Sequence, residues 1–330
     1  MNRKVSVAPM MDCTDRHERY FLRLISKNVL LYTEMIVSEA IDRGDKKKLL
    51  SFNINEKPLA LQVGGSSPKL LANAAKLGEE FGYDEINLNL GCPSKKVQKN
   101  KFGACLMKEP GLVAECLNKM KSSTNLPVTV KTRIGYDDQE DYENLYKFID
   151  KLKNTGVKTF IIHARKAMLG KFTPKQNLNI PPLKYDFVYN LKKDFSNEEI
   201  IINGGITSTE QIKNHLIKVD GVMIGRSVYH SPYFLSEIEK EIYKNNNTPS
   251  RQEVIENLIP YVKQETKKGT RLNQIMRHTL GLFHGQTGSN FWKRYLSENL
   301  CVRDADVKKI DHIMDKVKLA PQAHSVGQVD

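Results

Sequence analysis

Apolar residues recur along the first part of the chain in short runs with alternating or continuous hydrophobicity, the pattern of buried strands. Stretches with apolar residues at every third or fourth position, typical of amphipathic helices, lie between most of these runs. Examples are PKLLANAAKLGEEFG, PGLVAECLNKMKSS and YENLYKFIDKLKNTG. The expected strands are VSVAPM (5–10), LLYTEM (30–35), LALQVGG (59–65), EINLNLG (85–91), VTVKTR (128–133), TFIIHAR (159–165), IIINGG (200–205) and GVMIGR (221–226).

Alternation of strand and helix predicts a parallel sheet, and eight repeats favour a closed (β/α)8 TIM barrel. An open doubly wound sheet is the alternative fold. It would carry a Gly-x-Gly-x-x-Gly turn after the first strand, but MDCTDRHERY follows there and contains no glycine. The barrel is therefore the predicted α/β architecture.

The pattern changes after residue 240, where EIYKNNNTPSRQE resembles a linker and no strand pattern follows. Helices are expected over 251–268, 271–284, 290–300 and 304–318. The predicted domains are the barrel over residues 1–240 and a small all-helical domain over 241–330.

The N-terminal MNRKVSVAPMMD lacks the apolar core of a signal peptide, and no run is long enough for a membrane helix, so we expect a cytoplasmic protein without membrane contact. Five cysteines without a Cys-x-x-Cys pair indicate neither a disulfide framework nor a zinc site. Cys105 and Cys116 lie among apolar neighbours, so we expect both thiols to be buried.

The formal net charge of +13 favours a polyanionic partner such as a nucleic acid. A surface that is basic only for solubility is the alternative. Composition alone does not choose between them.

Polar residues gather where the predicted strands end, which is the catalytic face of such barrels. Each of them alone has an ordinary structural explanation, but together they would leave many buried polar groups unpaired unless a polar ligand satisfied them. The strand ends carry Pro9, Met10 and Met11; Glu34; Gln62; Asn87, Asn89 and Cys92; Lys131 and Arg133; His163 and Arg165; Asn203, Gly204 and Gly205; Gly225 and Arg226.

Flavin mononucleotide (FMN) fits this set. Gly204-Gly205 and Gly225-Arg226 follow the last two strands, where such barrels often bind phosphate. Lys131 would neutralise charge on the reduced ring, and Gln62 would hydrogen-bond its polar edge. Pro9, Met10 and Met11 would line the ring.

Several long stretches resemble the tRNA-dihydrouridine synthases, in particular their A-type bacterial subgroup. The resemblance spans nearly the whole chain. It is carried by SVAPMMDCTDRHERYFLRL, LLYTEM, LALQVGGSSP, GYDEINLNLGCPSKKVQKNKFGACLM, PVTVKTRIGYDD, FIIHARKA, INGGI, DGVMIGR and RLNQIMRHTLGLFHGQTGSNFWKRYLSENL.

The resemblance implies an FMN enzyme that uses NADPH to reduce the C5=C6 bond of uridines in the tRNA D-loop, with uridines 20 and 20a as the expected targets. It also implies that Cys92 is the catalytic acid. The residues that it implies as flavin contacts are those named above from the strand ends: Pro9 to Met11, Gln62, Lys131, His163, Asn203 to Gly205 and Gly225 to Arg226. A hydride delivered to C6 requires a proton at C5 from the opposite face. A thiol is mostly protonated at neutral pH, so Cys92 can supply it, aimed by Gly91 and Pro93.

The tRNA body would be held through its phosphates while the target uridine is unstacked into the pocket. Asn89 would hydrogen-bond the flipped base. The candidate RNA contacts are Arg277, His278, Trp292, Lys293 and Arg294, together with the loop 171–177, especially Lys175 and Asn177. Leu178 departs from the subgroup's pattern, in which a charged residue usually follows this asparagine, and this weakens inference about which uridine is chosen.

Two other functions remain open at this point. A flavin barrel acting on a free pyrimidine, in the manner of dihydroorotate or dihydropyrimidine dehydrogenases, shares the site but leaves the basic helical region unexplained. An RNA-binding protein without chemistry would leave Cys92, Lys131 and His163 unexplained.

Overall fold

A computed structural model describes residues 1–300 of the chain. The helix expected over 304–318 and Cys301 lie outside the described residues. No helix within residues 1–300 is long and apolar enough to cross a membrane.

All eight expected runs form strands, and a short ninth strand, β3, was not expected. The parallel sheet has the order β1-β9-β8-β7-β6-β5-β4-β2, with β3 paired to β4. The N–H of Val7 donates to the carbonyl of Leu30 at 2.9 Å and closes the sheet on itself. The predicted (β/α)8 barrel is confirmed. The strands are β1 (Val5–Val7), β2 (Leu31–Tyr32), β3 (Ile36–Val37), β4 (Leu59–Gly64), β5 (Glu85–Leu90), β6 (Val128–Arg133), β7 (Thr159–His163), β8 (Glu199–Asn203) and β9 (Gly221–Ile224).

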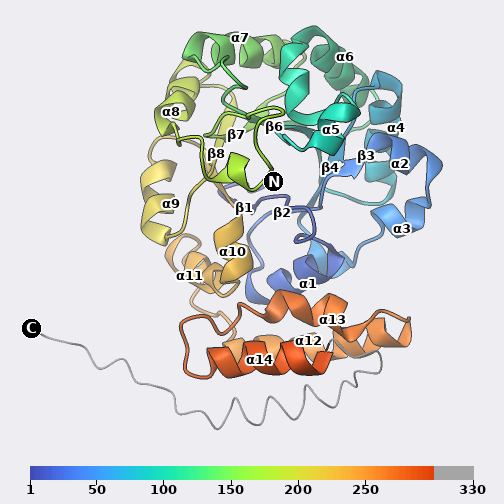
Figure 1. Cartoon of the computed structure of the whole chain (residues 1–330), viewed down its shortest axis with the longest axis vertical. Helices are drawn as coiled ribbons and strands as arrows, with labels where there is room; N and C mark the ends of the chain where they lie inside the picture. The colour runs from blue at the N-terminus through green and yellow to red at the C-terminus, as the bar shows by residue number, and fades with distance from the viewer. Residues whose placement is uncertain (301–330) are drawn as a thin grey trace, which may run out of the picture. The chain divides into compact units, whose positions relative to one another are not determined.

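Helices α4, α6, α7, α8 and α9 surround the strands (Figure 1). Several begin at a capping side chain: Ser67, Asp141 and Ser208 accept from backbone N–H groups at the starts of α4, α7 and α9. The described helices are α1 (Arg16–Ile25), α2 (Ser38–Arg43), α3 (Lys46–Leu50), η1 (Ile54–Glu56), α4 (Pro68–Glu80), α5 (Lys95–Lys99), η2 (Gly103–Lys108), α6 (Pro110–Lys121), α7 (Tyr142–Lys153), η3 (Gln176–Leu178), α8 (Tyr185–Asp194), α9 (Thr209–Leu216), α10 (Arg226–His230), α11 (Phe234–Glu241), α12 (Arg251–Lys267), α13 (Leu272–Met276), η4 (Arg277–Thr279) and α14 (Ser289–Leu300).

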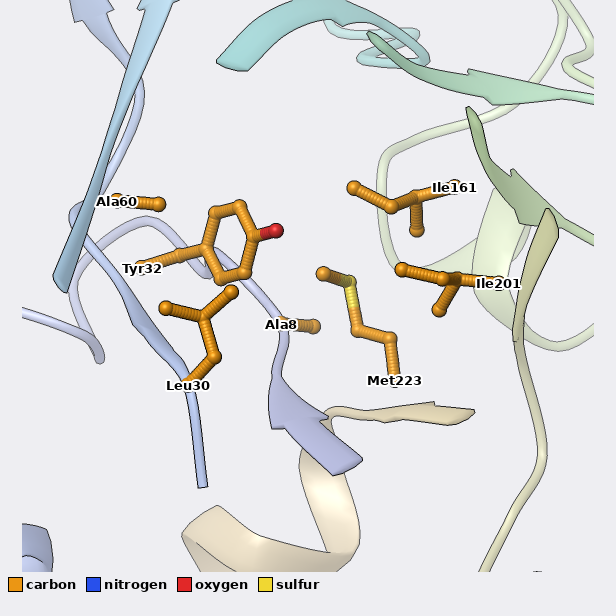
Figure 2. Packing of buried hydrophobic residues seen from close by; sticks show 7 residues of the cluster. All are labelled: Ala8, Leu30, Tyr32, Ala60, Ile161, Ile201 and Met223. Atoms are coloured by element: carbon orange, nitrogen blue, oxygen red, sulfur yellow. The ribbon is translucent and has the colours of Figure 1, made fainter. Parts of the chain in front are cut away.

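The interior of the barrel is a packed core (Figure 2). Both β4 and β5 are buried along their whole length, as expected for strands covered on both faces. The side chains that fill the middle of the barrel come from most of its strands and therefore hold its cross-section fixed. They are Ala8, Leu30, Tyr32, Ala60, Ile161, Ile201 and Met223.

The described residues form two compact units, Met1–Arg16 with Asn28–Gly225, and His17–Lys27 with residues 226–300. Helix α1 joins the second unit because His17 hydrogen-bonds Tyr261 at 2.8 Å and Tyr20 stacks on the same ring at 3.9 Å. The unit boundary thus precedes α10 and α11, whereas the sequence placed a boundary at residue 240. The division of function between barrel and helical domain stays a prediction.

Helices α12 and α14 confirm those expected over 251–268 and 290–300, and the helix expected between them differs. Helix α12 begins at a capping box between Ser250 and Glu253. The helix expected over 271–284 instead ends at Met276 and continues only as the short turn η4. Beyond that turn, Gly281 approaches the carbonyl of His230 so closely that a Cβ would lie 2.2 Å from the oxygen.

Candidate active site

The polar residues at the strand ends share one face of the sheet. Parallel neighbours in register point to the same side, and Gln62 pairs with Asn87, Asn89 with Lys131, and His163 with Asn203. Asn203 is also in register with Met223, which belongs to the core that fills the barrel. These polar side chains therefore project into the barrel at the C-terminal end of its strands.

Lys131 is a cation held without an acidic partner among residues 1–300. It is half-buried, and its ammonium donates to Oδ1 of Asn203 at 3.0 Å. Nδ2 of Asn203 donates in turn to the carbonyl of Met223 at 2.8 Å, so the acceptor is fixed. Burial, and after it the nearby Arg133 guanidinium, lower the pKa of Lys131 to about 7. Such a site favours an anionic ligand group.

Arg133 ties two loops of the site together. Its Nε donates to the carbonyl of Gly91 at 2.9 Å, while NH1 donates to the carbonyls of Lys166 and Asn177 at 3.0 and 3.1 Å. The side chain is only 3% exposed, and burial lowers its pKa to about 10. The guanidinium thus fixes the end of β5 against the loop 166–177.

Cys92 is a free, half-buried thiol on the loop after β5. Oδ1 of Asn89 accepts from the backbone N–H groups of Gly91 at 3.1 Å and Cys92 at 3.0 Å. The carbonyl of Cys92 accepts from the N–H of Ala104 at 3.0 Å. Asn89 is paired in register with Lys131, and Gly91 accepts from Arg133, so the residues that precede Cys92 lie against the end of β6 that carries both cations.

Gly204 and Gly205 follow β8 with φ angles of 123° and 72°, a region that favours glycine. A Cβ on Gly204 would lie 2.9 Å from both His163 and Leu183, so the backbone passes directly against the histidine ring. The hydroxyl of Tyr185 donates to the carbonyl of Gly204 at 2.7 Å. The turn therefore places the backbone of Gly204 next to His163, at the C-terminal end of the strands.

The loop after β1 meets the end of β9. A Cβ on Gly225 would lie 3.5 Å from Sδ of Met10. Pro9 and Met10 are half-buried, whereas Met11 is 58% exposed. Arg226 opens α10 in the second unit, so its contact with a phosphate stays a prediction.

These residues fit FMN. The uncompensated Lys131 and the turn at Gly204-Gly205 suit a cofactor with a phosphate and a ring that gains negative charge on reduction. Within the described part of the chain, His, Cys, Asp and Glu side chains form no group of three or more placed to hold a metal ion.

The family model for dihydrouridine synthase (Dus) matches residues 6–318. The chain belongs to the dihydrouridine synthase family. Curated relatives named tRNA-dihydrouridine(20/20a) synthase support this over nearly full length. The relative from Synechocystis sp. is 53% identical, over 91% of this chain and 90% of the relative's own length. That of Shewanella oneidensis is 52% identical over 94% and 92%, and that of Escherichia coli K12 is 50% identical over 95% and 91%.

A more distant solved structure shares only the fold with this dihydrouridine synthase. The complex of 2-naphthoyl-CoA reductase with 2-naphthoyl-CoA superposes with a TM-score of 0.53 at 11% identity. The match covers 73% of this chain and 50% of that one.

Several RNA contacts expected from the sequence of this dihydrouridine synthase lie inside the protein. Trp292 is fully buried, with Nε1 donating to the carbonyl of Thr279 at 2.9 Å, and His278 is 2% exposed. Asn177 is likewise fully buried, because its amide donates to the carbonyls of Met168, Phe172 and Thr173 and folds its own loop. As placed, these three side chains do not reach the surface.

The remaining basic residues that were predicted to contact RNA lie at or near the protein surface. Lys175, Arg277 and Arg294 are exposed, and Lys293 is half-buried. Arg294 lies 4.0 Å from Glu298, a surface pair that holds it only weakly.

The two other barrel cysteines differ from each other. Cys116 is buried as expected, and burial raises its pKa to about 12. Cys105 is only half-buried, with its thiol donating to the carbonyl of Phe102, so the expectation of full burial was wrong there.

Glu85 and Thr129, which were not among the predicted site residues, form a polar floor beneath the site together with Asn87. The three side chains are at most 1% exposed and are linked by hydrogen bonds. The signal was present: in β5 the polar residues 85, 87 and 89 alternate with Ile86, Leu88 and Leu90. This alternation indicates one polar, inward-facing side.

Proposed function

We propose that this dihydrouridine synthase reduces the C5=C6 bond of uridines in the D-loop of tRNA, at positions 20 and 20a, with FMN as cofactor and NADPH as reductant. Family membership makes it an oxidoreductase that forms dihydrouridine. The positions come from the name shared by its relatives.

The observation that carries the proposal is the placement of Cys92 at the C-terminal end of β5, where Asn89 holds its backbone N–H and is paired in register with Lys131. FMN, when bound, supplies the hydride. Lys131 compensates negative charge near the ring, with Asn203 fixing the position of the ammonium. Cys92 then donates a proton to C5 of the uracil ring, on the face opposite the hydride.

A tRNA is a large polyanion, so a tRNA substrate would account for the basic side chains on the surface. The exposed Lys175, Arg277 and Arg294 and the half-buried Lys293 would contact phosphates, which position a tRNA without reading its sequence. The oxygen of Asn89 already accepts two backbone N–H groups, and one hydrogen of its Nδ2 is donated to Gln62. The second Nδ2 hydrogen is therefore the one that remains for a flipped base. We expect the enzyme in the cytoplasm, where tRNA is modified.

The test is to map dihydrouridine by position in tRNA from cells lacking this protein. Loss confined to positions 20 and 20a, restored by the wild-type gene, is the expected result. Unchanged dihydrouridine at both positions contradicts the proposal. Reduction of free uridine as fast as tRNA by the purified enzyme would favour a small-molecule dehydrogenase instead.

A further inference from the structure

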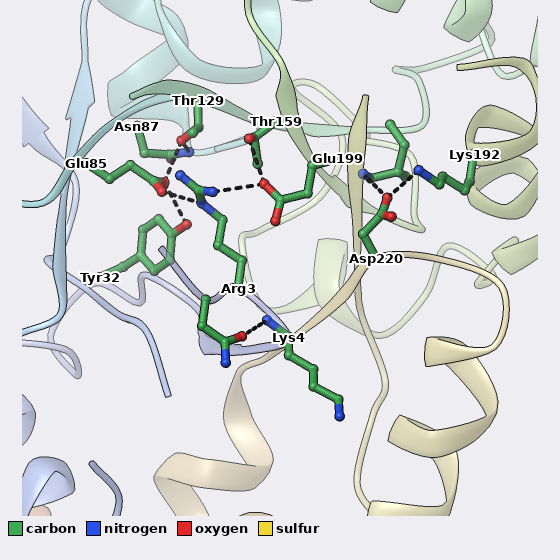
Figure 3. Close-up of polar contacts among 12 residues, drawn as sticks. Arg3, Lys4, Tyr32, Glu85, Asn87, Thr129, Thr159, Lys192, Glu199 and Asp220 are labelled. Carbon is green, nitrogen blue, oxygen red and sulfur yellow. Dashed lines mark hydrogen bonds and ion pairs between the residues drawn. The ribbon is translucent and has the colours of Figure 1, made fainter. Parts of the chain in front are cut away.

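A continuous chain of buried hydrogen bonds runs from the floor of the barrel to the loop that carries Cys92. It starts at Glu85, whose Oε2 accepts from Nε of Arg3 at 2.6 Å (Figure 3). Oε1 accepts from the hydroxyls of Tyr32 at 2.8 Å and Thr129 at 2.6 Å. The carboxylate is fully buried, so these partners hold it in one orientation.

The chain continues upward through three amides. Nδ2 of Asn87 donates to Oγ1 of Thr129 at 2.8 Å, and Nε2 of Gln62 donates to Oδ1 of Asn87 at 2.7 Å. Nδ2 of Asn89 donates to Oε1 of Gln62 at 2.8 Å. At the top, Oδ1 of Asn89 accepts from the N–H groups of Gly91 and Cys92.

Both ends of the chain fix its direction. A backbone N–H can only donate, so Asn89 must turn its oxygen toward Cys92. An ionised carboxylate can only accept, so the Thr129 hydroxyl must point toward Glu85. Every amide between them is therefore oriented the same way, and hydrogen bonds aligned in this manner strengthen one another.

Water cannot replace a broken link, because Gln62, Asn87 and Thr129 are each at most 1% exposed. Without the Thr129 hydroxyl, Asn87 would lose the acceptor that keeps its amide from turning over. A turned Asn87 would present its NH2 group to that of Gln62, and the conflict would pass to Asn89. Asn89 would then present donors to the N–H groups of Gly91 and Cys92.

We infer that Thr129 and Asn87 are positioning residues for Cys92, acting through the amides of Gln62 and Asn89. The inference rests on the proposed role of Cys92 as proton donor only where turnover is concerned. The placement of the thiol is measurable independently of that role.

The experiment compares Thr129→Val with Thr159→Val. Both substitutions replace a buried hydroxyl by a methyl group of similar size, and both hydroxyls donate to a carboxylate bound by Arg3. Thr159 donates to Glu199 at 2.8 Å and lies outside the chain that leads to Cys92. Thr129→Ser keeps the hydroxyl and serves as the rescue variant.

Two readouts are taken on each FMN-loaded protein: the rate of Cys92 alkylation by iodoacetamide, followed by peptide mass spectrometry, and single-turnover oxidation of the reduced protein by tRNA. Thr129→Val is expected to slow tRNA-dependent oxidation by about 10- to 100-fold through misplacement of the proton donor. It should also change the alkylation rate of Cys92 several-fold. Thr159→Val and Thr129→Ser should stay near the wild type.

Equal behaviour of Thr129→Val and Thr159→Val in both readouts would overturn the inference. A changed alkylation rate with unchanged oxidation by tRNA would support the positioning of Cys92 and count against its role as acid. Should Thr129→Val not fold, Asn87→Leu provides the second variant, because leucine is similar in size but offers no acceptor to Nε2 of Gln62. Wild-type alkylation of Cys92 in that variant would equally refute the inference.

Discussion

The ammonium of Lys131 on β6 reaches past β7 to hydrogen-bond Oδ1 of Asn203 on β8 at 3.0 Å. Among residues 1–300 no carboxylate forms an ion pair with it. Lys131 thus has no compensating negative charge at the barrel mouth, and an anionic cofactor would favour its charged form.

Replacing Lys131 by Met should weaken FMN binding and slow or abolish reduction of the bound flavin by NADPH, because the charge that offsets the reduced ring is lost. Stopped-flow absorbance of the flavin measures the rate directly. Lys119→Met, an exposed lysine on α6, is the matched control and should behave as wild type. An unchanged reductive half-reaction in Lys131→Met would remove the lysine from this role.

The same lysine should make the stability of the FMN-free protein depend on pH. Its folded pKa of about 7 lies below the ordinary 10.5, so the charged form is disfavoured in the folded state. The loss of folding stability caused by the buried ammonium of Lys131 is absent above the pKa of the unfolded state. It grows as the pH falls toward 7 and is constant below that. The free energy of unfolding of the wild type relative to Lys131→Met should therefore fall between pH 10 and pH 7.

Urea denaturation of both proteins at several pH values measures this difference, and other titrating groups cancel in the comparison. A difference that does not vary between pH 7 and 10 would contradict the lowered pKa. Addition of FMN should reduce the pH dependence, since the cofactor's negative charge favours the ammonium.

Cys92→Ala should leave FMN binding and reduction by NADPH intact but slow single-turnover oxidation by tRNA by roughly 10² to 10⁴, the usual share of a positioned proton donor. Cys92→Ser should be almost as slow, because a hydroxyl is a much weaker acid. Cys116→Ala is the control: the thiol is buried away from solvent, so its loss should lower the melting temperature more than the rate. Wild-type oxidation by Cys92→Ala would mean that the proton comes from elsewhere.

Replacing both Lys293 and Arg294 by Ala should raise the apparent dissociation constant for tRNA. It should also reduce the slope of log affinity against log salt by about 1 for each phosphate that the protein no longer neutralises. Filter binding at several salt concentrations measures both quantities. Reduction of the flavin by NADPH should not change, and Lys119→Ala, an exposed substitution on the barrel, should keep the wild-type slope. Unaltered tRNA affinity would exclude this face of α14 as an RNA-binding surface.

The eight-stranded barrel and the position of Cys92 after β5 were both predictable from the amino-acid sequence. Strand periodicity and the glycine and proline around the thiol are local features, readable without long-range contacts. Alternation also identified most of the polar residues at the barrel mouth, because parallel strands end at one face.

The partners of those residues, in contrast, depend on how distant segments pack. Arg3 meets Glu85 across 82 residues of chain and Glu199 across 196, pairings that no local pattern specifies. Trp292 and Asn177 were expected to face RNA, but packing and hydrogen bonds place them inside. Side-chain burial depends on which element covers a residue, and that cover comes from segments distant in the sequence.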